Sequence, residues 1–484
     1  MTYPFDLIVI GSGPGGQRAA VQGAKTGKKV LIVEEFSSMG GGCVHVGTLP
    51  SKSLRESVYR YSLSSRGTLG QEAEHHKDPL KTRVLPDMER LLRRKDRVVK
   101  TEAEIVFNQL ERNLVTMKQG RAKIVSPHEV VVTQGGASET FSAKFILIAT
   151  GAKPMAPPHI QVDGIHVLDS DSVLKLKTMP KSMVVLGAGI IGCEYASMFS
   201  MAGTQVYLVD RRNEILSTVD REISTHLFER FQAGGMEVVL GCETESIEIV
   251  PAKETRKASV KVHLNNHRKL HAEVALVCLG RSGNSSDLGL EALGIDCDSR
   301  GLIKVDPHFR TQVPSIYAVG DVVGNPALAS TSMEQGRIAC CHAFQMEATN
   351  FQGGYVMPPF FPYGIYTIPE ISTLGKTEEE LIELKANFVA GRARYRELAR
   401  GQIVGDHWGL LKLLVDRSTL KLLGVQIVGD NAAELIHIGQ AVMSLDGDVN
   451  YFIQNVFNYP TLAEAYKTAA FHAINQIRGT TSSK

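Results

Sequence analysis

One pattern occurs twice in this chain and constrains its fold more than any other feature. Each copy consists of an apolar strand, a glycine-rich turn, a helix, a second strand and an acidic residue. The first copy runs from Phe5 to Glu34 and contains FDLIVI-GSGPGG, and the second runs from Met183 to Asp210 and contains MVVL-GAGIIG. In both copies the acid lies 23 residues after the first glycine. This is the βαβ unit that binds dinucleotides, so the duplication predicts an α/β protein with two Rossmann-like domains.

Every glycine of the motif has a physical task. The first permits the tight turn, the second lets the backbone approach a pyrophosphate, and the third lets the helix pack on the strand. The helix N-terminus supplies N–H groups for the phosphates, and the acid accepts hydrogen bonds from a ribose diol. The residues predicted to bind the two nucleotides are Gly11, Gly13, Gly16 and Glu34 in the first copy and Gly187, Gly189, Gly192 and Asp210 in the second.

Two arginines follow the second acid, in the run Asp210-Arg211-Arg212. An acid at this position favours the free 2′-hydroxyl of NAD, whereas a neighbouring arginine can pair with the 2′-phosphate of NADP. We therefore include Arg211 in the predicted nucleotide site, which could then accept either nucleotide. The alternative, in which one arginine merely points to solvent, has equal weight.

Other apolar runs predict further strands and two C-terminal helices. Strands are expected at Val130–Phe141, Lys144–Ile148, Ser259–Leu264, Val274–Leu279, Ser315–Val319, Leu410–Val415 and Leu422–Val428. Helices are expected at Ala432–Leu445 and Thr461–Ile477, and the polar stretch 65–78 is expected to be a loop. The mixture after residue 351 indicates a separate α+β unit.

Composition excludes several classes of partner. The 53 basic and 51 acidic side chains nearly balance, so neither nucleic acid nor an acidic membrane is expected as a partner. The basic run Glu89–Arg97 is interpreted as a solvated helix face. No apolar stretch approaches about 18 residues, and the start lacks a signal-peptide pattern. Seven scattered cysteines favour a reducing cytoplasm over a disulfide framework. We expect no metal site, because the histidines lack ligand spacing.

The segment after the first copy is the most informative about chemistry. Residues 40–52 read GGGCVHVGTLPSK, and the chain also contains Ala149-Thr150-Gly151, Gly280-Arg281 and Gly320-Asp321. In these motifs the chain resembles the pyridine nucleotide–disulfide oxidoreductases over essentially its whole length. The resemblance implies one FAD per subunit on the first copy, with Asp321 at the ribityl chain and Glu194 paired with Lys52 near flavin N5. It adds Cys43, Thr150, Gly151, Gly280 and Gly320 to the predicted cofactor-binding residues, with Lys52 and Glu194 as the catalytic pair.

Two departures from that family concern its disulfide chemistry. The family's first redox cysteine is present as Cys43, but its second is replaced by Thr48, which cannot form a disulfide. The C-terminal histidine that serves as acid and base is replaced by Tyr459, although the glutamate that follows remains as Glu464. Tyrosine, with an ordinary pKa near about 10, is a poor base at neutral pH. Electrons are therefore not expected to reach a disulfide substrate.

The departures match a transhydrogenase branch of the family, through GGGCVHVGT and FNYPTLAEAY. The reaction implied is NADPH + NAD⁺ ⇌ NADP⁺ + NADH, of the Si-specific type. Because one nicotinamide site is visible, the resemblance implies a ping-pong cycle through reduced FAD. Three alternatives remain: a flavin reductase that uses a quinone, dye or O₂, a flavoprotein module without turnover, and an unorthodox disulfide between Cys43 and the Cys340-Cys341 pair.

The resemblance also implies the organisation of the chain. Residues 1–155 and 281–350 are expected to form the FAD-binding and central parts, and residues 156–280 the NAD(P)-binding domain. Residues 351–484 are expected to form a dimerisation domain. The partners expected are small-molecule nucleotides and at least one further copy of the chain, in a homodimer or higher homo-oligomer.

Overall fold

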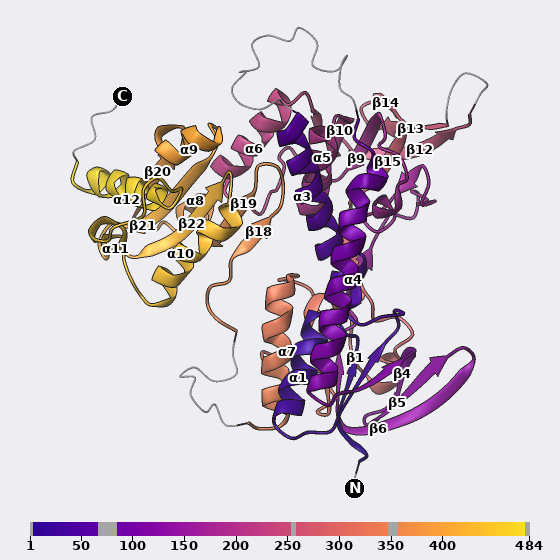
Figure 1. The fold of residues 1–484 in the computed structure, drawn as a ribbon. Helices are drawn as coiled ribbons and strands as arrows, with labels where there is room; N and C mark the ends of the chain where they lie inside the picture. Colours follow the sequence, from indigo (N-terminus) through magenta and orange to yellow (C-terminus); the bar gives the residue numbers. More distant parts are fainter. Residues whose placement is uncertain (1–2, 66–84, 253–257, 347–356, 480–484) are drawn as a thin grey trace.

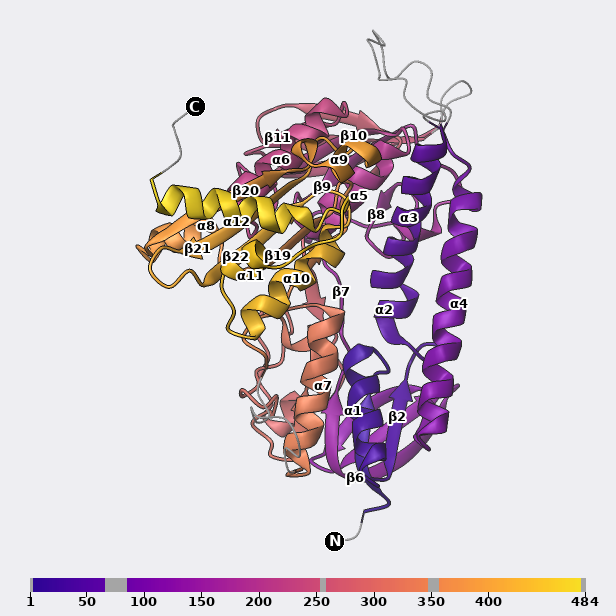
Figure 2. The same cartoon turned by 60° about the vertical axis from the view of Figure 1, so that its left-hand side comes forward.

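The structure is a computed structural model of the 484-residue chain, and it describes residues 3–65, 85–252, 258–346 and 357–479. Figures 1 and 2 show three groups of elements, and the first contains segments that lie both before and after the second in the sequence, so indigo and orange elements stand together in it. Apart from Ser65, the loop expected at residues 65–78 lies outside the described residues. Among the residues described, no helix is both long and apolar enough to cross a membrane.

The first group is a seven-stranded sheet together with five helices. Its strands, in the order β3-β2-β1-β6-β5-β4 with β17 on β6, are β1 (Phe5–Ile10), β2 (Val30–Glu34), β3 (Thr116–Gln119), β4 (Arg121–Ser126), β5 (Glu129–Gln134), β6 (Ala137–Ile148) and β17 (Ile316–Ala318). Its helices are α1 (Pro14–Lys25), α2 (Gly41–His45), α3 (Thr48–Ser65), α4 (Met88–Arg112) and α7 (Ala329–Ala343). Helices α1 and α7 lie side by side in both views, although more than 300 residues separate their starts.

One expectation for this sheet is wrong. The run Val130–Phe141 is not a single strand, because Gly135 and Gly136 adopt positive φ values of 57° and 86° and turn the chain between β5 and β6. Strand β6 then continues to Ile148 and joins two kinds of pairing. Its first half pairs antiparallel with β5, and its second half pairs parallel with β1 and β17.

The second group repeats the parallel arrangement. Its five-stranded sheet has the order β11-β10-β9-β15-β8 and consists of β8 (Val167–Leu168), β9 (Ser182–Leu186), β10 (Gln205–Asp210), β11 (Glu237–Leu240) and β15 (Val274–Val277). Helices α5 (Ile190–Met201) and α6 (Arg221–Ala233) accompany it, together with an antiparallel sheet of β12 (Thr244–Val250), β13 (Ser259–Leu264) and β14 (Lys269–Ala272). Two short antiparallel strands, β7 (Ala152–Pro154) and β16 (Arg281–Gly283), link this group to the first.

The third group is an antiparallel sheet with helices, placed at the left of Figure 1. The sheet has the order β18-β19-β22-β21-β20 and consists of β18 (Tyr363–Ile365), β19 (Ile371–Gly375), β20 (Phe388–Arg394), β21 (Leu410–Asp416) and β22 (Leu422–Val428). Its helices are α8 (Glu378–Glu383), α9 (Ala399–Val404), α10 (Ala432–Ser444), α11 (Asn450–Gln454) and α12 (Glu464–Ile477). Both predicted C-terminal helices are confirmed as α10 and α12, although α12 begins three residues after Thr461.

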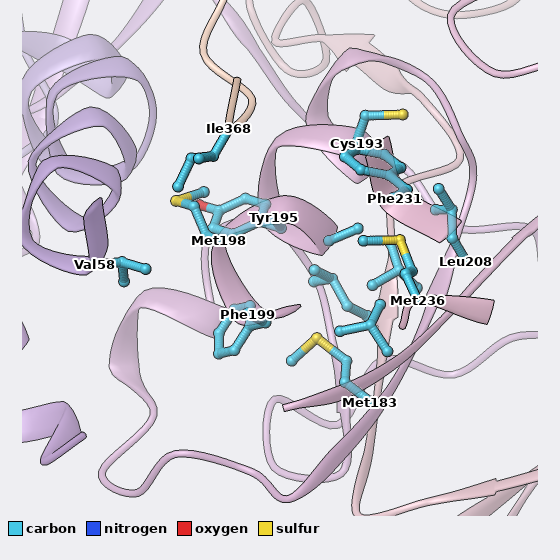
Figure 3. Packing of buried hydrophobic residues seen from close by; sticks show 14 of the residues in the cluster. Val58, Met183, Cys193, Tyr195, Met198, Phe199, Leu208, Phe231, Met236 and Ile368 are labelled. Atoms are coloured by element: carbon cyan, nitrogen blue, oxygen red, sulfur yellow. The ribbon is translucent and has the colours of Figure 1, made fainter. Parts of the chain in front are cut away.

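A large apolar core lies where the three groups meet. Helix α5 has buried residues on most of its surface, as expected for a helix between a sheet and another helix. Figure 3 shows Tyr195, Met198 and Phe199 of α5 between Val58 of α3 and Met183 of β9, with Ile368 of the third group above them. Burial of such large side chains stabilises the junction by about 1.5–3 kcal/mol each. This packing fixes the polar ends of α3 and α5 that form the site.

Candidate active site

A single cleft of about 1950 Å³ passes both glycine turns. Its lining contains all but two of the residues predicted to bind a cofactor; the exceptions are Gly16 and Gly192, the third glycines of the two motifs. A Cβ added to either would overlap the carbonyl oxygen of the first glycine in its own motif, Gly11 or Gly187. The third glycines therefore permit close packing behind the cleft, and their contacts are with protein.

The first and second glycines face the cleft. Gly11 and Gly187 have φ values of 100° and 102°, which L side chains rarely adopt. Among the described residues, no atom lies within 4 Å of a Cβ added to Gly13, and the atom nearest to a Cβ added to Gly189 is Arg212 Nη2 at 4.0 Å. The N-termini of α1 and α5 thus open onto space of the kind that a pyrophosphate needs.

Glu34 is held by uncharged donors. Its Oε2 accepts hydrogen bonds from Ser12 N at 2.8 Å and Ser12 Oγ at 2.5 Å, and its Oε1 accepts one from Phe36 N at 2.9 Å. Ser12 Oγ in turn accepts a hydrogen bond from Gly40 N at 2.8 Å. Glu34 is only 4% exposed. Sequence reasoning missed Ser12, although it lies inside the first motif.

Asp210 is held by an arginine. Arg212 donates to Asp210 Oδ1 through Nε at 3.1 Å and to Oδ2 through Nη2 at 3.0 Å, and its Nη1 donates to Ser217 Oγ at 2.8 Å. Ala188 N also donates to Asp210 Oδ2, at 2.6 Å. Burial alone would raise the pKa of Asp210, but Arg212 and the main-chain N–H groups lower it. Arg211 is exposed at the cleft wall, so the contact with the acid comes from Arg212.

Lys52 and Glu194 join the first and second groups. Lys52 lies in the first turns of α3 and Glu194 in α5, and Lys52 Nζ donates to Glu194 Oε2 at 2.7 Å. The second oxygen, Oε1, accepts a hydrogen bond from Tyr366 N at 2.8 Å, and Lys52 Nζ also lies 5.1 Å from the centre of the Tyr366 ring. The buried carboxylate therefore fixes a lysine cation at the cleft between the two glycine turns. Tyr366 was not foreseen from the sequence.

Two further side chains on the same face of α3 as Lys52 also contact acidic residues. Arg55 and Tyr59 follow Lys52 at helical spacing, so all three lie on one side of the helix. Arg55 Nη1 lies 3.0 Å from Glu370 Oε1, and Tyr59 OH donates to Asp430 Oδ1 at 2.9 Å. The three side chains therefore contact three acids from different parts of the chain, and we call this row of contacts the ladder along α3. The ladder sets the position of α3, and with it that of Lys52.

Cys43 faces Thr48 rather than a second thiol. The Thr48 hydroxyl hydrogen-bonds to the Cys43 side chain. Burial is the largest influence on the thiol and raises its pKa above the ordinary value, in spite of this hydrogen bond and of Lys52. The thiol is therefore neutral at physiological pH, and the position that would accept its sulfur is a hydroxyl.

The remaining predicted residues close the cleft around the first glycine turn. Thr150 Oγ1 donates to Asn284 O at 2.7 Å, Asn284 Nδ2 donates back to Thr150 O at 3.0 Å, and Gly320 N donates to Gln335 Oε1 at 2.7 Å. Burial raises the pKa of Asp321, which lines the same cleft. An open helix N-terminus, a buried ribose acid and a further carboxyl for hydroxyl donors fit a flavin dinucleotide.

Tyr459 and Glu464, the residues at the C-terminal position where the chain departs from the family, are not among the residues that line the cleft. Tyr459 is 73% exposed, and Glu464 has a buried Oε2 with no hydrogen-bond partner among the described residues. Within the same residues there is no group of three or more histidines, cysteines and acids that could hold a metal ion.

Two dinucleotide-binding folds that share one cleft, with a lysine–glutamate pair between them, define a class of oxidoreductase that works with two dinucleotides. Comparisons with known proteins agree. Residues 5–336 match the model of the pyridine nucleotide-disulphide oxidoreductase family, and residues 361–470 match the dimerisation domain of that family. The chain belongs to the pyridine nucleotide-disulphide oxidoreductase family. Membership implies the use of FAD and a nicotinamide nucleotide, and the predicted fold class is confirmed.

The similar proteins narrow the comparison further. The chain is 45% identical to a soluble pyridine nucleotide transhydrogenase of Mycobacterium bovis strain BCG, and the match covers 98% of each chain. It is 40% identical to one of Serratia proteamaculans, over 98% of this chain and 99% of that one. Among solved structures, LpdA from Mycobacterium tuberculosis has a TM-score of 0.86 at 25% identity, and the match covers 99% of this chain and 100% of LpdA. The HOCl-induced flavoprotein disulfide reductase RclA from Escherichia coli, in a Cu(II) complex, has a TM-score of 0.84 at 26% identity. That match covers 97% of this chain and 99% of RclA.

Proposed function

We propose that this protein transfers hydride between the two nicotinamide nucleotides, NADPH + NAD⁺ ⇌ NADP⁺ + NADH, with one FAD per subunit. The observation that supports this most directly is the contact between Cys43 and Thr48, which takes the place of a dithiol. Electrons that enter the cleft have no disulfide through which to leave. The relatives named soluble pyridine nucleotide transhydrogenase, at 40–45% identity over nearly the full length, support the same conclusion.

The chain's own residues would hold FAD at the first glycine turn. Glu34 would accept from the ribose, the N-terminus of α1 would face the pyrophosphate, and Asp321 would accept from the ribityl chain. When bound, FAD supplies reversible two-electron hydride chemistry. Lys52 would place a positive charge beside the isoalloxazine, and Glu194 would keep that charge in place.

One nicotinamide site would serve both substrates. The guanidinium of Arg212 is suited to the 2′-phosphate of NADP, whereas Asp210 is suited to the ribose diol of NAD. Because the two side chains are bound to each other, either nucleotide would displace one of them from its partner. NADPH would bring the hydride and leave as NADP⁺, and NAD⁺ would then enter the same site, take the hydride and leave as NADH, in a ping-pong sequence. Transfer is expected on the Si-specific face of both nicotinamides.

The deciding experiment is an anaerobic half-reaction. NADPH should bleach the flavin absorbance, and NAD⁺ added after removal of NADP⁺ should restore it with formation of NADH. NADPH deuterated on the Si-specific face should bleach the flavin more slowly than unlabelled NADPH and give unlabelled NADP⁺, whereas NADPH deuterated on the other face should give NADP⁺ that keeps the label. Failure of NADPH to bleach the flavin would favour a module without turnover. Reoxidation by a quinone or O₂ but not by NAD⁺ would favour a flavin reductase.

We further propose that the protein is a homodimer or higher homo-oligomer that acts in the cytoplasm. The match of residues 361–470 to a dimerisation domain supports self-association, and the word soluble in the relatives' names supports the location. Analytical ultracentrifugation should give at least twice the monomer mass of 52.8 kDa. Sedimentation as a monomer at micromolar concentration would contradict the proposal.

A further inference from the structure

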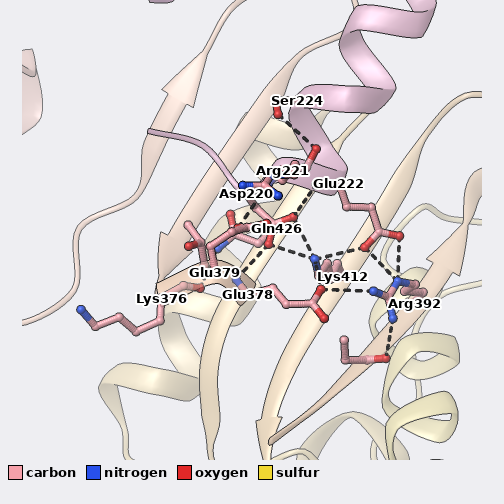
Figure 4. Close-up of polar contacts among 12 residues, drawn as sticks. Asp220, Arg221, Glu222, Ser224, Lys376, Glu378, Glu379, Arg392, Lys412 and Gln426 are labelled. Atoms are coloured by element: carbon pink, nitrogen blue, oxygen red, sulfur yellow. Dashed lines mark hydrogen bonds and ion pairs between the residues drawn. The ribbon is translucent and has the colours of Figure 1, made fainter. Parts of the chain in front are cut away.

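A buried cluster of charges lies away from the cleft, where the second group meets the C-terminal sheet. Figure 4 shows its centre, Lys412 of β21, surrounded by acids from two other elements. Lys412 Nζ lies 2.8 Å from Asp220 Oδ1, 3.0 Å from Glu222 Oε2 and 2.5 Å from Glu378 Oε2. Lys412 and Asp220 are 1% and 0% exposed. Arg392 of β20 completes the cluster, with its Nε 2.7 Å from Glu222 Oε1.

Asp220 has two tasks in this cluster. It is the N-cap of α6, where its Oδ1 accepts a hydrogen bond from Glu222 N at 3.1 Å. Its Oδ2 also accepts one from Glu378 N at 3.1 Å, across the boundary with the C-terminal sheet. The start of α6 is therefore attached to β21 and α8 by ion pairs and by a main-chain hydrogen bond. Removal of Lys412 would leave the buried carboxylate of Asp220 without its ion-pair partner.

The segment between Asp210 and Asp220 carries Arg212. It leaves β10 at the ribose acid and reaches α6 at the cluster, so both of its ends are held by ion pairs. Between them, Ile215 and Leu216 are buried in the core, and Leu216 N donates to Ala188 O at 2.9 Å beside the second glycine turn. A displacement of Asp220 would therefore be passed to the loop that aims the guanidinium of Arg212.

We propose that Lys412 is a positioning residue for nucleotide selection, because it anchors the end of residues 211–219 and so keeps Arg212 beside Asp210. The inference rests on the proposed role of the second glycine turn as the site for both nucleotides. Burial alone would lower the pKa of Lys412, but Asp220, Glu378 and Glu222 raise it, so the anchor stays charged over the physiological range.

The test measures recognition of the 2′-phosphate without hydride transfer. Adenosine 2′,5′-bisphosphate and AMP differ only in that phosphate, and their binding to the FAD-loaded enzyme is measured by isothermal titration calorimetry. In Lys412→Met, the preference for the bisphosphate should fall by about tenfold, the loss expected when one charge-assisted hydrogen bond is misplaced. Affinity for AMP should change by less than about twofold. The matched control is Lys376→Met, since Lys376 is 51% exposed and pairs only loosely with Glu380, at 3.6 Å.

A second variant tests the inference in case Lys412→Met alone does not fold. Lys412→Met combined with Asp220→Asn removes both charges of the buried pair, and asparagine remains a good N-cap. This double variant should fold, retain FAD and show the same loss of preference. A wild-type preference in the folded double variant, or equal weakening of both probes, would overturn the inference. Because neither probe carries nicotinamide, the result is independent of whether NAD⁺ accepts the hydride.

Discussion

The two glycine turns have the same backbone but differ in how their ribose acids are held. Glu34 and Asp210 are both nearly buried, at 4% and 6% exposure, and each accepts a main-chain N–H from the residue after the first glycine. Glu34 takes its other hydrogen bonds from a serine hydroxyl and a main-chain N–H. Asp210 is instead bound by the guanidinium of Arg212, whose side chain is 44% exposed.

This difference is consistent with two kinds of occupancy. Donors that are buried and neutral suit a ligand that binds once and stays, because nothing has to leave to make room for it. The guanidinium of Arg212 is half-exposed, so an incoming nucleotide can reach it and exchange its contact with Asp210 for contacts to the ligand. Such an exchange suits a site that releases and binds substrates in every cycle.

Alanine at the middle glycine of each motif should separate the two units most strongly. Gly13→Ala and Gly189→Ala place a methyl group in the open space before α1 and α5 without a clash inside the protein. Gly13→Ala should lose FAD, and Gly189→Ala should keep FAD but need roughly 100-fold more NADPH, equivalent to about 2.7 kcal/mol. Flavin absorbance after gel filtration and the rate of flavin bleaching measure the two effects. Loss of flavin from Gly189→Ala alone would reverse the assignment of the units.

Lys52→Met tests the link between the units. Loss of the cation should slow flavin reduction by NADPH roughly 100-fold, in the range found for removal of one preorganised electrostatic contact. Glu194→Gln keeps the lysine but loosens it, so its effect should be smaller. Both are measured by anaerobic stopped-flow absorbance, with Lys376→Met as the control. An unchanged rate in Lys52→Met, with FAD bound, would exclude the cation from the chemistry.

Replacement of the two arginines separately tests the exchange at Asp210. Arg212→Ala should raise the KM for NADPH about tenfold or more, as expected for a charge-assisted hydrogen bond, and leave the KM for NADH near the wild-type value. Arg211→Ala, at an exposed position without a contact to the acid, should change either KM by less than about twofold. Steady-state kinetics with each donor measure this. The opposite ranking would assign nucleotide selection to Arg211.

Cys43→Ser should have the smallest effect, less than about twofold on transfer from NADPH to NAD⁺, because a buried neutral thiol adds little to hydride transfer.

The raised pKa of the Cys43 thiol has a second consequence, for its reaction with alkylating reagents. The reactive thiolate is less populated at pH 7 than for an ordinary thiol, and it grows only as the pH rises through the raised pKa. Alkylation by iodoacetamide should therefore be slow at pH 7 and accelerate at alkaline pH. Fast alkylation at pH 7 or loss of activity in Cys43→Ser would contradict this.

Features set by a few neighbouring residues could be predicted from the sequence. Both glycine turns, their strands and their acids follow from local backbone geometry, and the predicted fold class is confirmed. The wrong strand at Val130–Phe141 also had a local signal, since Gly135-Gly136 is a typical turn dipeptide.

Contacts between distant segments could not be predicted in the same way. Arg211 and Arg212 are adjacent, and Arg212 is the one that turns back to Asp210, in a loop whose later residues Ile215 and Leu216 are buried against distant parts of the chain. A lysine within the apolar run LLKLLVD signals that Lys412 needs a buried partner, but the sequence does not show that the partner is Asp220. The roles assigned to the cleft residues remain predictions that the variants above can test.

The ladder along α3 has a consequence for the order in which the protein is assembled. Lys52 and Glu194 are 142 residues apart, and Tyr59 and Asp430 are 371 residues apart. During synthesis, the helix emerges long before the acids that hold it, and closing such long loops is slow. A nascent chain that ends before Glu370 can form the first glycine turn, but it lacks two of the three contacts that hold α3. We therefore expect the turn that receives FAD to form early and the lysine beside it to settle only when the chain is nearly complete.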